Sequence, residues 1–222
     1  MRAFHLLSKQ HALQALQNQR LKVARFDDLN DPFELLAADL SDRRVRRTFI
    51  KWKTQTSKKI GLLCFSMSWR NPLLWSHYAD RHCGVALEFE IDDDFVVPVR
   101  YSLSRLRLNV PHIMSSGGFT ENLAEQLAST KSKHWAYEEE VRVPVALSQC
   151  VLENGLHFER LTEQVKVVGV VLGALSQVTS HEVRCSLPRG RQVTLRRCRM
   201  AVRSFSIVRN KGIPVEFIDG TA

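Results

Sequence analysis

The feature that most constrains the fold is a series of short apolar segments that follow one another, in several places with no helical pattern between them. Continuous or alternating apolar residues predict strands near 21–26, 61–65, 84–90, 96–101, 141–147, 165–172, 193–200 and 204–208. Capping residues and helical spacing predict helices near 8–17, 42–59, 121–131 and 177–187, and another that begins at Asn71. Because helices do not regularly separate the strands, this order favours an α+β fold over a doubly wound parallel sheet.

Length and composition predict one globular domain over residues 1–222. The chain is 44% hydrophobic and 25% charged, which is enough apolar material for a core. Its five cysteines form no CxxC pair, which favours reduced thiols in a cytoplasm over disulfides or a zinc site. Neither a signal peptide nor an apolar run of ~20 residues is visible. These two features predict a cytoplasmic protein with no membrane partner. The histidines are dispersed without HExxH, so we expect no metal.

The basic charge is concentrated in the C-terminal portion, at about residues 176–222. The chain has a formal net charge of +9, and the segment from Arg184 to Lys211 holds eight arginines and one lysine without any acid. The arginine fork matches phosphate oxygens, which predicts contact with nucleic acid or another polyanion. The predicted contacts are Arg189, Arg191, Arg196, Arg197 and Arg199. The alternative is a cationic surface with no partner, or one that pairs with an acidic protein.

An acidic segment from Trp135 to Arg142 is the strongest candidate for a site. Read as an extended strand, alternate residues share a face, so Glu138, Glu140 and Arg142 lie side by side, with Glu139 opposite. The two carboxylates would then be about 7 Å apart. Like charges raise each other's pKa and an arginine lowers it, so such a cluster belongs in a groove or a site. The alternative is a solvated edge strand with a charge pair.

Two other motifs allow a functional and a purely structural interpretation. Asn30 to Glu34 combines turn formers, acids and an aromatic, which suits a site rim or a metal ligand set, or else a proline-fixed turn with Phe33 buried. Ser66 ends a buried strand. Because GxSxG is absent, it fits a hydrogen-bonding pocket wall better than a nucleophile.

Together these motifs resemble a widespread bacterial family built on a domain of unknown function of about this length. The resemblance covers roughly residues 1–175. The motifs that carry it are Phe4-His5, Asn30 to Glu34, Cys64 to Ser66, Trp75 to Ala79, Gly84 to Phe89, Lys131 or Lys133, Trp135, and Tyr137-Glu138-Glu140-Arg142.

A more distant resemblance is to the ADP-ribosyltransferase superfamily, through a histidine on the first strand, a strand ending in serine and a Glu-x-Glu strand. It implies mixed, mostly antiparallel split sheets with flanking helices, and NAD as substrate in the cleft between them. The implied roles are Glu140 as the catalytic carboxylate that stabilises the cation formed when nicotinamide leaves, Glu138 as the group that orients or deprotonates the acceptor, and His5, Ser66, Tyr78 and Arg142 as NAD contacts. Met67 interrupts the usual Ser-Thr-Ser pattern, and Glu139 leaves the register of the acids open.

This resemblance implies an NAD-dependent ADP-ribosyltransferase or NAD hydrolase. It would act as a toxin or antiviral defence effector on nucleic acid or protein, with an antitoxin or defence-system partner. The first alternative is a non-catalytic module that binds nucleic acid or another polyanion through the basic C-terminal portion, with steep salt dependence. The second is a metal-dependent nuclease with Asp31, Glu138 and Glu140 around magnesium, which a chelator would inactivate.

Overall fold

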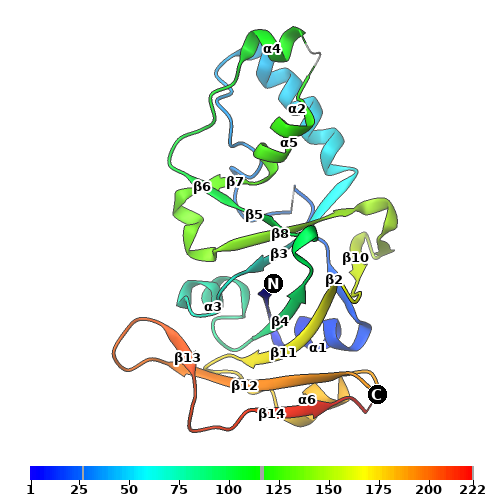
Figure 1. Cartoon of the computed structure of the whole chain (residues 1–222), viewed down its shortest axis with the longest axis vertical. Helices are drawn as coiled ribbons and strands as arrows, with labels where there is room; N and C mark the ends of the chain where they lie inside the picture. The colour runs from blue at the N-terminus through cyan, green and yellow to red at the C-terminus, as the bar shows by residue number, and fades with distance from the viewer. Residues whose placement is uncertain (27, 116–117, 222) are drawn as a thin grey trace.

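The chain folds into a mixed α+β structure in which helices flank one large, mostly antiparallel sheet (Figure 1). The computed structural model describes residues 1–26, 28–115 and 118–221. The predicted α+β class and the mostly antiparallel strands are confirmed. No helix in these residues combines the length and the apolar character that a bilayer crossing requires.

The large sheet has nine strands among the described residues, in the order β13-β12-β11-β4-β1-β3-β8-β5, with β14 beside β12. Their bounds are β1 Arg2–Leu7, β3 Ile60–Ser66, β4 Val85–Ile91, β5 Val97–Pro98, β8 Glu140–Ala146, β11 Val165–Leu172, β12 Gln192–Met200, β13 Ile207–Arg209 and β14 Glu216–Asp219. Within this sheet only β11 and β12 run parallel. β1 pairs with β4 along its whole length, but with β3 only at Phe4 and Ser66, so the sheet opens between β1 and β3.

Smaller elements surround this sheet. One three-stranded sheet joins β2 Arg20–Lys22, β10 Leu156–Arg160 and β9 Val151–Glu153, and a parallel pair joins β6 Arg100–Ser102 and β7 Thr130–Ser132. The α-helices are α1 Lys9–Asn18, α2 Arg43–Ser57, α3 Pro72–Tyr78, α4 Val110–Ser115, α5 Glu121–Ala128 and α6 Ser180–Cys185. The 3-10 helices are η1 Asp93–Phe95, η2 Lys133–Glu138 and η3 Leu147–Gln149.

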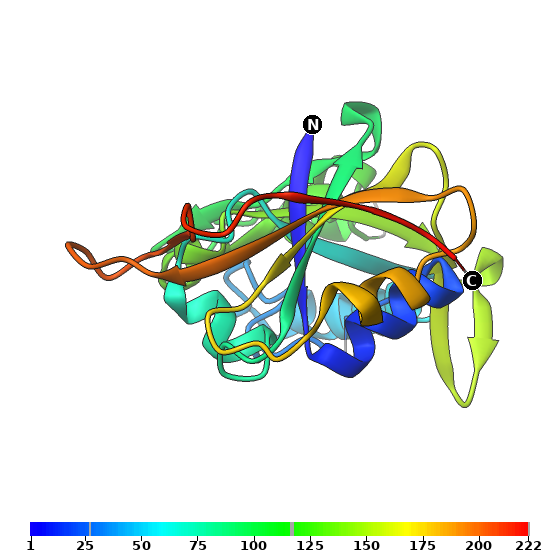
Figure 2. The ribbon, with the colours of Figure 1, turned by 90° about the horizontal axis from the view of Figure 1, so that it is seen from below.

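The helices divide into two groups. α1, α3 and α6 lie on one side of the large sheet (Figure 2), and α2, α4 and α5 gather at one end of the molecule (Figure 1). The caps predicted at Ser8 and Asn71 are observed, since the Ser8 side chain accepts from the backbone of α1 and that of Asn71 from the backbone of α3. Asp42, the predicted first residue of the next helix, caps α2 in the same way. A polar N-cap satisfies amide groups that the helix itself leaves unpaired, and so fixes the first residue of the helix.

Three buried apolar clusters hold these elements together. The largest joins the sheet to α1 and α6 and includes Leu16, Phe89 and Val183. A second is centred on Trp75 of α3, and a third packs Phe49 of α2 against Leu127 of α5. The Trp75 side chain is fully buried, so it acts as a core residue that fixes α3 on the sheet.

The predicted strand across residues 135–142 is wrong in its first half. η2 runs to Glu138, Glu139 has a left-handed backbone with φ 45° and ψ 48°, and β8 begins only at Glu140. Strand preferences of aromatic residues depend on packing. Here the rings of Trp135 and Tyr137 pack against His77 of α3, and this packing favours the 3-10 helix over a continuation of β8.

One further expectation is corrected. Phe33 is 56% exposed rather than buried, with the Arg105 guanidinium 5.6 Å from the centre of its ring. The alternative of a tight turn around Pro32 is otherwise borne out, since Asp31 Oδ1 accepts from the Phe33 amide at 2.9 Å.

Gly84 fixes α3 against the start of β4, and we expect Gly84→Ala to destabilise the fold. A Cβ at this position would lie 2.2 Å from the Leu7 carbonyl oxygen and 2.8 Å from the Ala79 carbonyl group. Both neighbours are backbone, so relief requires shifting β1 or the end of α3. The expected loss is about 3 kcal/mol in the free energy of unfolding, measured by urea titration. Gly212→Ala is the control, because its new methyl meets only a side-chain oxygen at 3.3 Å; equal losses in both variants would contradict this account.

Candidate functional site

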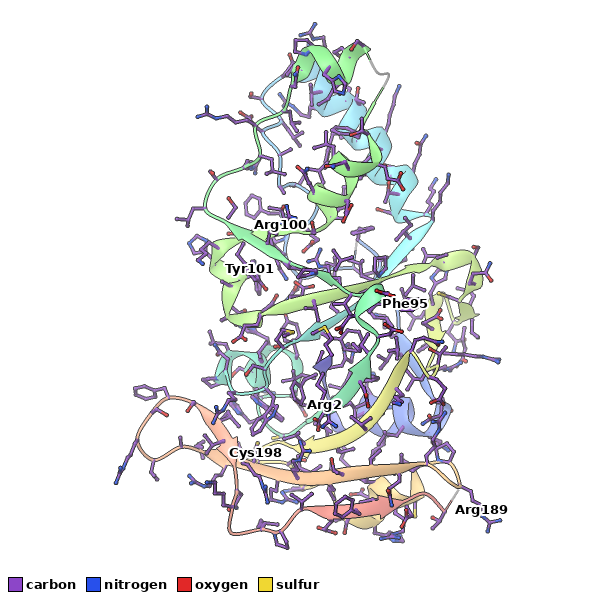
Figure 3. The ribbon with its side chains drawn as sticks, viewed as in Figure 1. Arg2, Phe95, Arg100, Tyr101, Arg189 and Cys198 are labelled. Atoms are coloured by element: carbon purple, nitrogen blue, oxygen red, sulfur yellow. The ribbon has the colours of Figure 1, made fainter. Side chains whose placement is uncertain are left out.

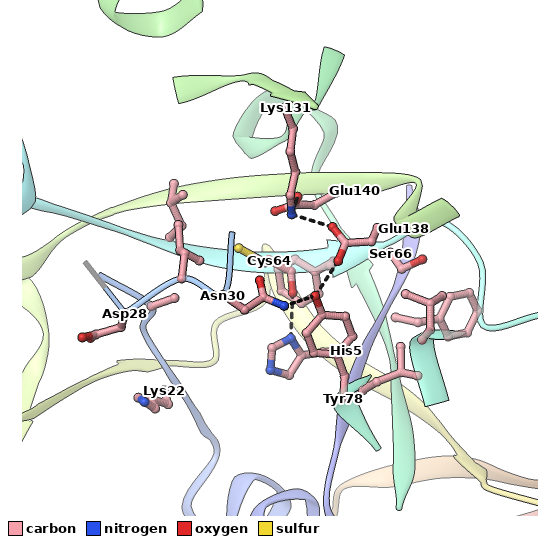
Figure 4. A pocket seen from close by; sticks show the side chains of 17 residues that line it. His5, Lys22, Asp28, Asn30, Cys64, Ser66, Tyr78, Lys131, Glu138 and Glu140 are labelled. Atoms are coloured by element: carbon pink, nitrogen blue, oxygen red, sulfur yellow. Dashed lines mark hydrogen bonds and ion pairs between the residues drawn. The ribbon is translucent and has the colours of Figure 1, made fainter. Parts of the chain in front are cut away.

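A cavity of about 240 Å³ lies where β1 and β3 separate (Figure 4). Its walls come from β1, β2 with the segment that follows it, β3, α3, β7, η2 and β8. The polar residues that line it are His5, Lys22, Asp28, Asn30, Ser66, Tyr78, Lys131, Glu138 and Glu140, and the rest of the lining is apolar except for the Cys64 thiol. A mostly apolar hollow with a few converging polar groups is the usual form of a small-molecule site.

Lys131 joins the two acids that line the cavity. Its ammonium nitrogen lies 2.6 Å from Glu138 Oε2 and 2.9 Å from Glu140 Oε2. The three side chains are only 5% to 6% exposed. Glu139 is exposed and does not line the cavity. The sequence left open which of the three acids face the cavity, and in the structure they are Glu138 and Glu140. The tight turn at Glu139 brings the two carboxylates together in place of the predicted strand alternation.

Arg142 lies behind Glu140 rather than in the cavity wall. Its Nε donates to Glu140 Oε1 at 2.8 Å, its Nη2 to Glu140 Oε2 at 3.1 Å, and its Nη1 to Glu34 Oε1 at 2.6 Å. A further bond from Nη1 reaches the Ala128 carbonyl at the end of α5. The guanidinium is 1% exposed, so its role in this structure is to hold Glu140 and Glu34 in place.

The cluster has more acid than base. Three buried carboxylates, those of Glu34, Glu138 and Glu140, meet two buried cations, those of Lys131 and Arg142. One negative charge is therefore in excess when all five groups are ionised. An uncompensated charge in a low-dielectric interior is costly, so the cluster favours either an added proton or a nearby positive charge.

The two cavity carboxylates differ in pKa. Burial raises the pKa of Glu138, and Lys131 and Tyr78 only partly oppose that rise. Burial acts on Glu140 in the same sense, but attraction to Arg142 and Lys131, with their hydrogen bonds, outweighs it and holds the pKa at about 2. Glu140 is therefore ionised at any physiological pH, and Glu138 is the carboxyl that takes up the extra proton most readily.

Tyr78 connects three segments across the cavity wall. Its hydroxyl donates to Glu138 Oε1 and accepts from Asn30 Nδ2 at 2.7 Å. Burial, followed by the charge of Glu138, raises the pKa of Tyr78, so the phenol stays protonated and remains a donor. A second tyrosine, Tyr101 on β6 (Figure 3), accepts from the backbone amide of Glu140 at 2.7 Å and fixes the first residue of β8.

His5 and Ser66 occupy the sheet side of the cavity. His5 Nδ1 lies 2.7 Å from the Cys64 carbonyl oxygen. A carbonyl only accepts, so Nδ1 carries the hydrogen, and because burial lowers the pKa of His5 the ring is neutral with Nε2 as an acceptor. The Ser66 hydroxyl donates to the Ser68 carbonyl at 2.6 Å and accepts from the Ser68 amide, so it shapes the end of β3.

The C-terminal arginines predicted to contact nucleic acid are mostly engaged within the protein. Arg196 pairs with Glu88 at 2.7 Å, Arg191 with Glu163 at 3.3 Å, and Arg197 donates to two backbone carbonyls. Arg199 bonds to the neighbouring Met200 carbonyl. Arg189 is exposed at the turn before β12 (Figure 3), away from the cavity.

Sequence reasoning missed the role of Lys131 and Glu34. The sequence predicted a helix around Lys131. The one indication that Lys131 is functional was its place, before Trp135, among the motifs that carry the family resemblance. Glu34 was more simply explained as part of a turn, because its partner Arg142 is more than a hundred residues away in the chain. Among residues 1–26, 28–115 and 118–221, no group of three or more His, Cys, Asp or Glu is arranged to hold a metal ion.

Comparison of the chain with protein-family models, with curated proteins and with solved structures finds no match.

The ion cluster makes a testable contribution to stability that depends on pH. The pKa of Glu140 falls from the ordinary 4.5 to about 2 on folding, so its contribution is complete above pH 4.5 and is lost as the pH falls toward 2. Glu140→Gln leaves Arg142 with one carboxylate, and we expect it to lose about 3 kcal/mol of unfolding free energy at neutral pH.

The measurement is thermal or urea unfolding of both proteins between neutral pH and the acid range. The gap between wild type and Glu140→Gln should narrow below pH 4.5, because the wild-type carboxylate is then being protonated. Glu139→Gln, which removes the same charge from an exposed position, should unfold like the wild type. A gap that is independent of pH would contradict the assignment.

Proposed function

We propose that this protein is an ADP-ribosyltransferase-like enzyme that cleaves NAD in the cavity between β1 and β3. The observation that carries the proposal is the convergence of the three motifs behind the resemblance. His5 of β1, Ser66 of β3 and the pair Glu138 and Glu140 all line one cavity. β1, β3 and β8 are neighbours in the sheet, and the sheet opens between the first two, as a cleft between split sheets requires.

The electrostatics of the cavity suit this chemistry. NAD carries a positive charge on its nicotinamide ring, and positive charge develops on the adjoining ribose as the ring leaves. A fixed excess of negative charge in a buried site stabilises that transition state most, because little water is present to screen it. The five-residue ion cluster supplies this excess, and the apolar lining keeps its dielectric low.

The two carboxylates have different environments, which favours two roles. Glu140 has its pKa held at about 2, so it serves as the permanent anion facing the reacting ribose. Glu138 has its pKa raised and is bonded to the Tyr78 hydroxyl, so it serves as the base that takes the acceptor's proton. Neutral His5, with Nε2 as acceptor, suits a ribose hydroxyl.

The cavity is large enough for about half of an NAD molecule. A cavity of about 240 Å³ is below the ~300–1,000 Å³ of sites that enclose a whole ligand. The nicotinamide and its ribose would occupy the end near Glu138, and the pyrophosphate would lie toward Lys22, whose ammonium is drawn at the other end of the cavity in Figure 4. Tyr78 would border the nicotinamide ring.

The geometry gives less support to the magnesium nuclease. Asp31 is buried in its own turn, and Lys131 occupies the space between Glu138 and Glu140 where a shared cation would bind. An ammonium in that position repels a divalent ion and engages one oxygen of each carboxylate that would otherwise bind it.

The first test is nicotinamide release from NAD by the purified protein, with and without nucleic acid as acceptor. We expect release by the wild type, and about a hundredfold loss in Glu138→Gln, since a positioned base contributes on the order of 10²-fold or more. Glu139→Gln is the matched control, because it makes the same change of charge one residue away, outside the cavity. Absence of NAD binding and of nicotinamide release in the folded wild type would refute the proposal.

The second test is the pH dependence of transfer. The base must be ionised, so the rate should fall as the pH drops through a Glu138 pKa that lies above the ordinary 4.5. The Tyr78 hydrogen bond lowers that pKa, so Tyr78→Phe should move the acid limb of the kcat/KM profile to higher pH. A limb that stays in place, or one that persists in Glu138→Gln, would remove Glu138 from the role of base.

A further inference from the structure

α2 carries a second concentration of positive charge, separate from the C-terminal portion. Between Asp42 and Asp80 the chain has nine lysines and arginines and no acid. Eight of these nine lie in α2 or in the two residues that follow it. α2 lies at the end of the molecule opposite β12 and β14 (Figure 1), so the two basic regions are distinct surfaces.

Three cations of α2 and Lys58, the residue that caps its C-terminal end, form one row. Arg43, Arg47, Lys51 and Lys58 are exposed, and at ~100° per residue they fall within an arc of roughly 80° over about 22 Å of helix. The opposite face is buried, where the rings of Phe49 and Trp52 pack against Phe119 in edge-on and tilted arrangements. The row therefore faces outward because the apolar face fixes the rotation of the helix.

These four side chains make no ion pair or hydrogen bond with any other described residue. Their neighbours Arg44 and Arg46 are engaged, with Asp42 and with the carbonyls of Leu40 and Ser41. In the C-terminal region Arg191, Arg196 and Arg197 are engaged, and the exposed cations Arg189, Arg203, Arg209 and Lys211 lie on separate turns, loops and a short strand rather than along one helix face. A row of like charges with no internal partner is destabilising by itself, and an external polyanion would relieve that repulsion.

We infer that the outward face of α2, formed by Arg43, Arg47, Lys51 and Lys58, binds the phosphate backbone of nucleic acid. Guanidinium and ammonium groups spaced along one straight face match a linear array of phosphates. An anionic membrane fits less well, because a helix that binds in the bilayer interface needs a free apolar face, and that of α2 is occupied by the core. This inference does not rest on the proposed NAD chemistry.

The test compares two charge-matched variants of the full-length protein. In the first, Arg43, Arg47, Lys51 and Lys58 become Gln, which is nearly as good a helix former as Lys or Arg. In the second, four exposed cations of the C-terminal region, Arg189, Arg203, Arg209 and Lys211, become Gln. Both variants lose the same net charge. Binding to fluorescently labelled double-stranded and single-stranded oligonucleotides is titrated over a range of salt concentrations, after circular dichroism has established that both variants are folded.

Four phosphate contacts predict a slope of about −3.6 for log K against log salt on duplex DNA, which is about a hundredfold loss of affinity between 50 and 200 mM salt. The α2 variant should bind at least about tenfold more weakly, with a slope near −1 or flatter, while the C-terminal variant keeps the wild-type slope.

Three results would overturn the inference: loss confined to the C-terminal variant, equal loss in both variants, or a wild type that binds vesicles containing anionic lipid but neither oligonucleotide. The first would place the surface on the C-terminal portion. The second would show that oligonucleotide binding depends on the net charge of the protein and not on a defined surface. The third would make the partner a lipid surface.

Discussion

The structure depends on the burial of Arg142 with its carboxylates. A guanidinium that is 1% exposed is tolerable only if its nitrogens find acceptors, and here each of the three donates to Glu34, Glu140 or the Ala128 carbonyl. These partners come from the loop before α2, from β8 and from the end of α5. Satisfying one buried charge therefore ties the helical end of the molecule to the large sheet, and it fixes the position of the acids that line the cavity.

The same cluster makes the cavity chemically asymmetric. Arg142 and Lys131 use most of the hydrogen-bonding capacity of Glu140 and hold it ionised, while Glu138, one tight turn earlier, has a raised pKa and bonds to Tyr78. The left-handed residue Glu139 makes this possible, because a continuous strand would have spaced the two carboxylates along an edge. The difference in protonation behaviour thus follows from backbone geometry, and it suits a site in which one acid stays charged and the other exchanges a proton.

The distribution of positive charge shows why net charge is a poor guide to a binding surface. The C-terminal portion has the higher count of arginines, yet several of them stabilise the sheet by pairing with Glu88 and with backbone carbonyls. α2 has cations that nothing in the described structure neutralises. Its buried aromatic face turns them outward, so the composition of a segment states how much charge it has, and packing decides how much of that charge faces a partner.

The sequence by itself determined the α+β class, the helix starts at Ser8, Asp42 and Asn71, and the apolar strands at 61–65 and 165–172, since caps and periodicity act over a few residues. It also indicated that Glu138 and Glu140 belong together. Only the tertiary structure decided that they meet through a 3-10 turn, that Lys131 lies between them and that Glu34 reaches Arg142. The contact of Glu34 with Arg142 joins residues 108 positions apart, and Lys131 meets the two acids only because the chain turns back between them. The energies of these contacts arise from burial, which no local pattern encodes.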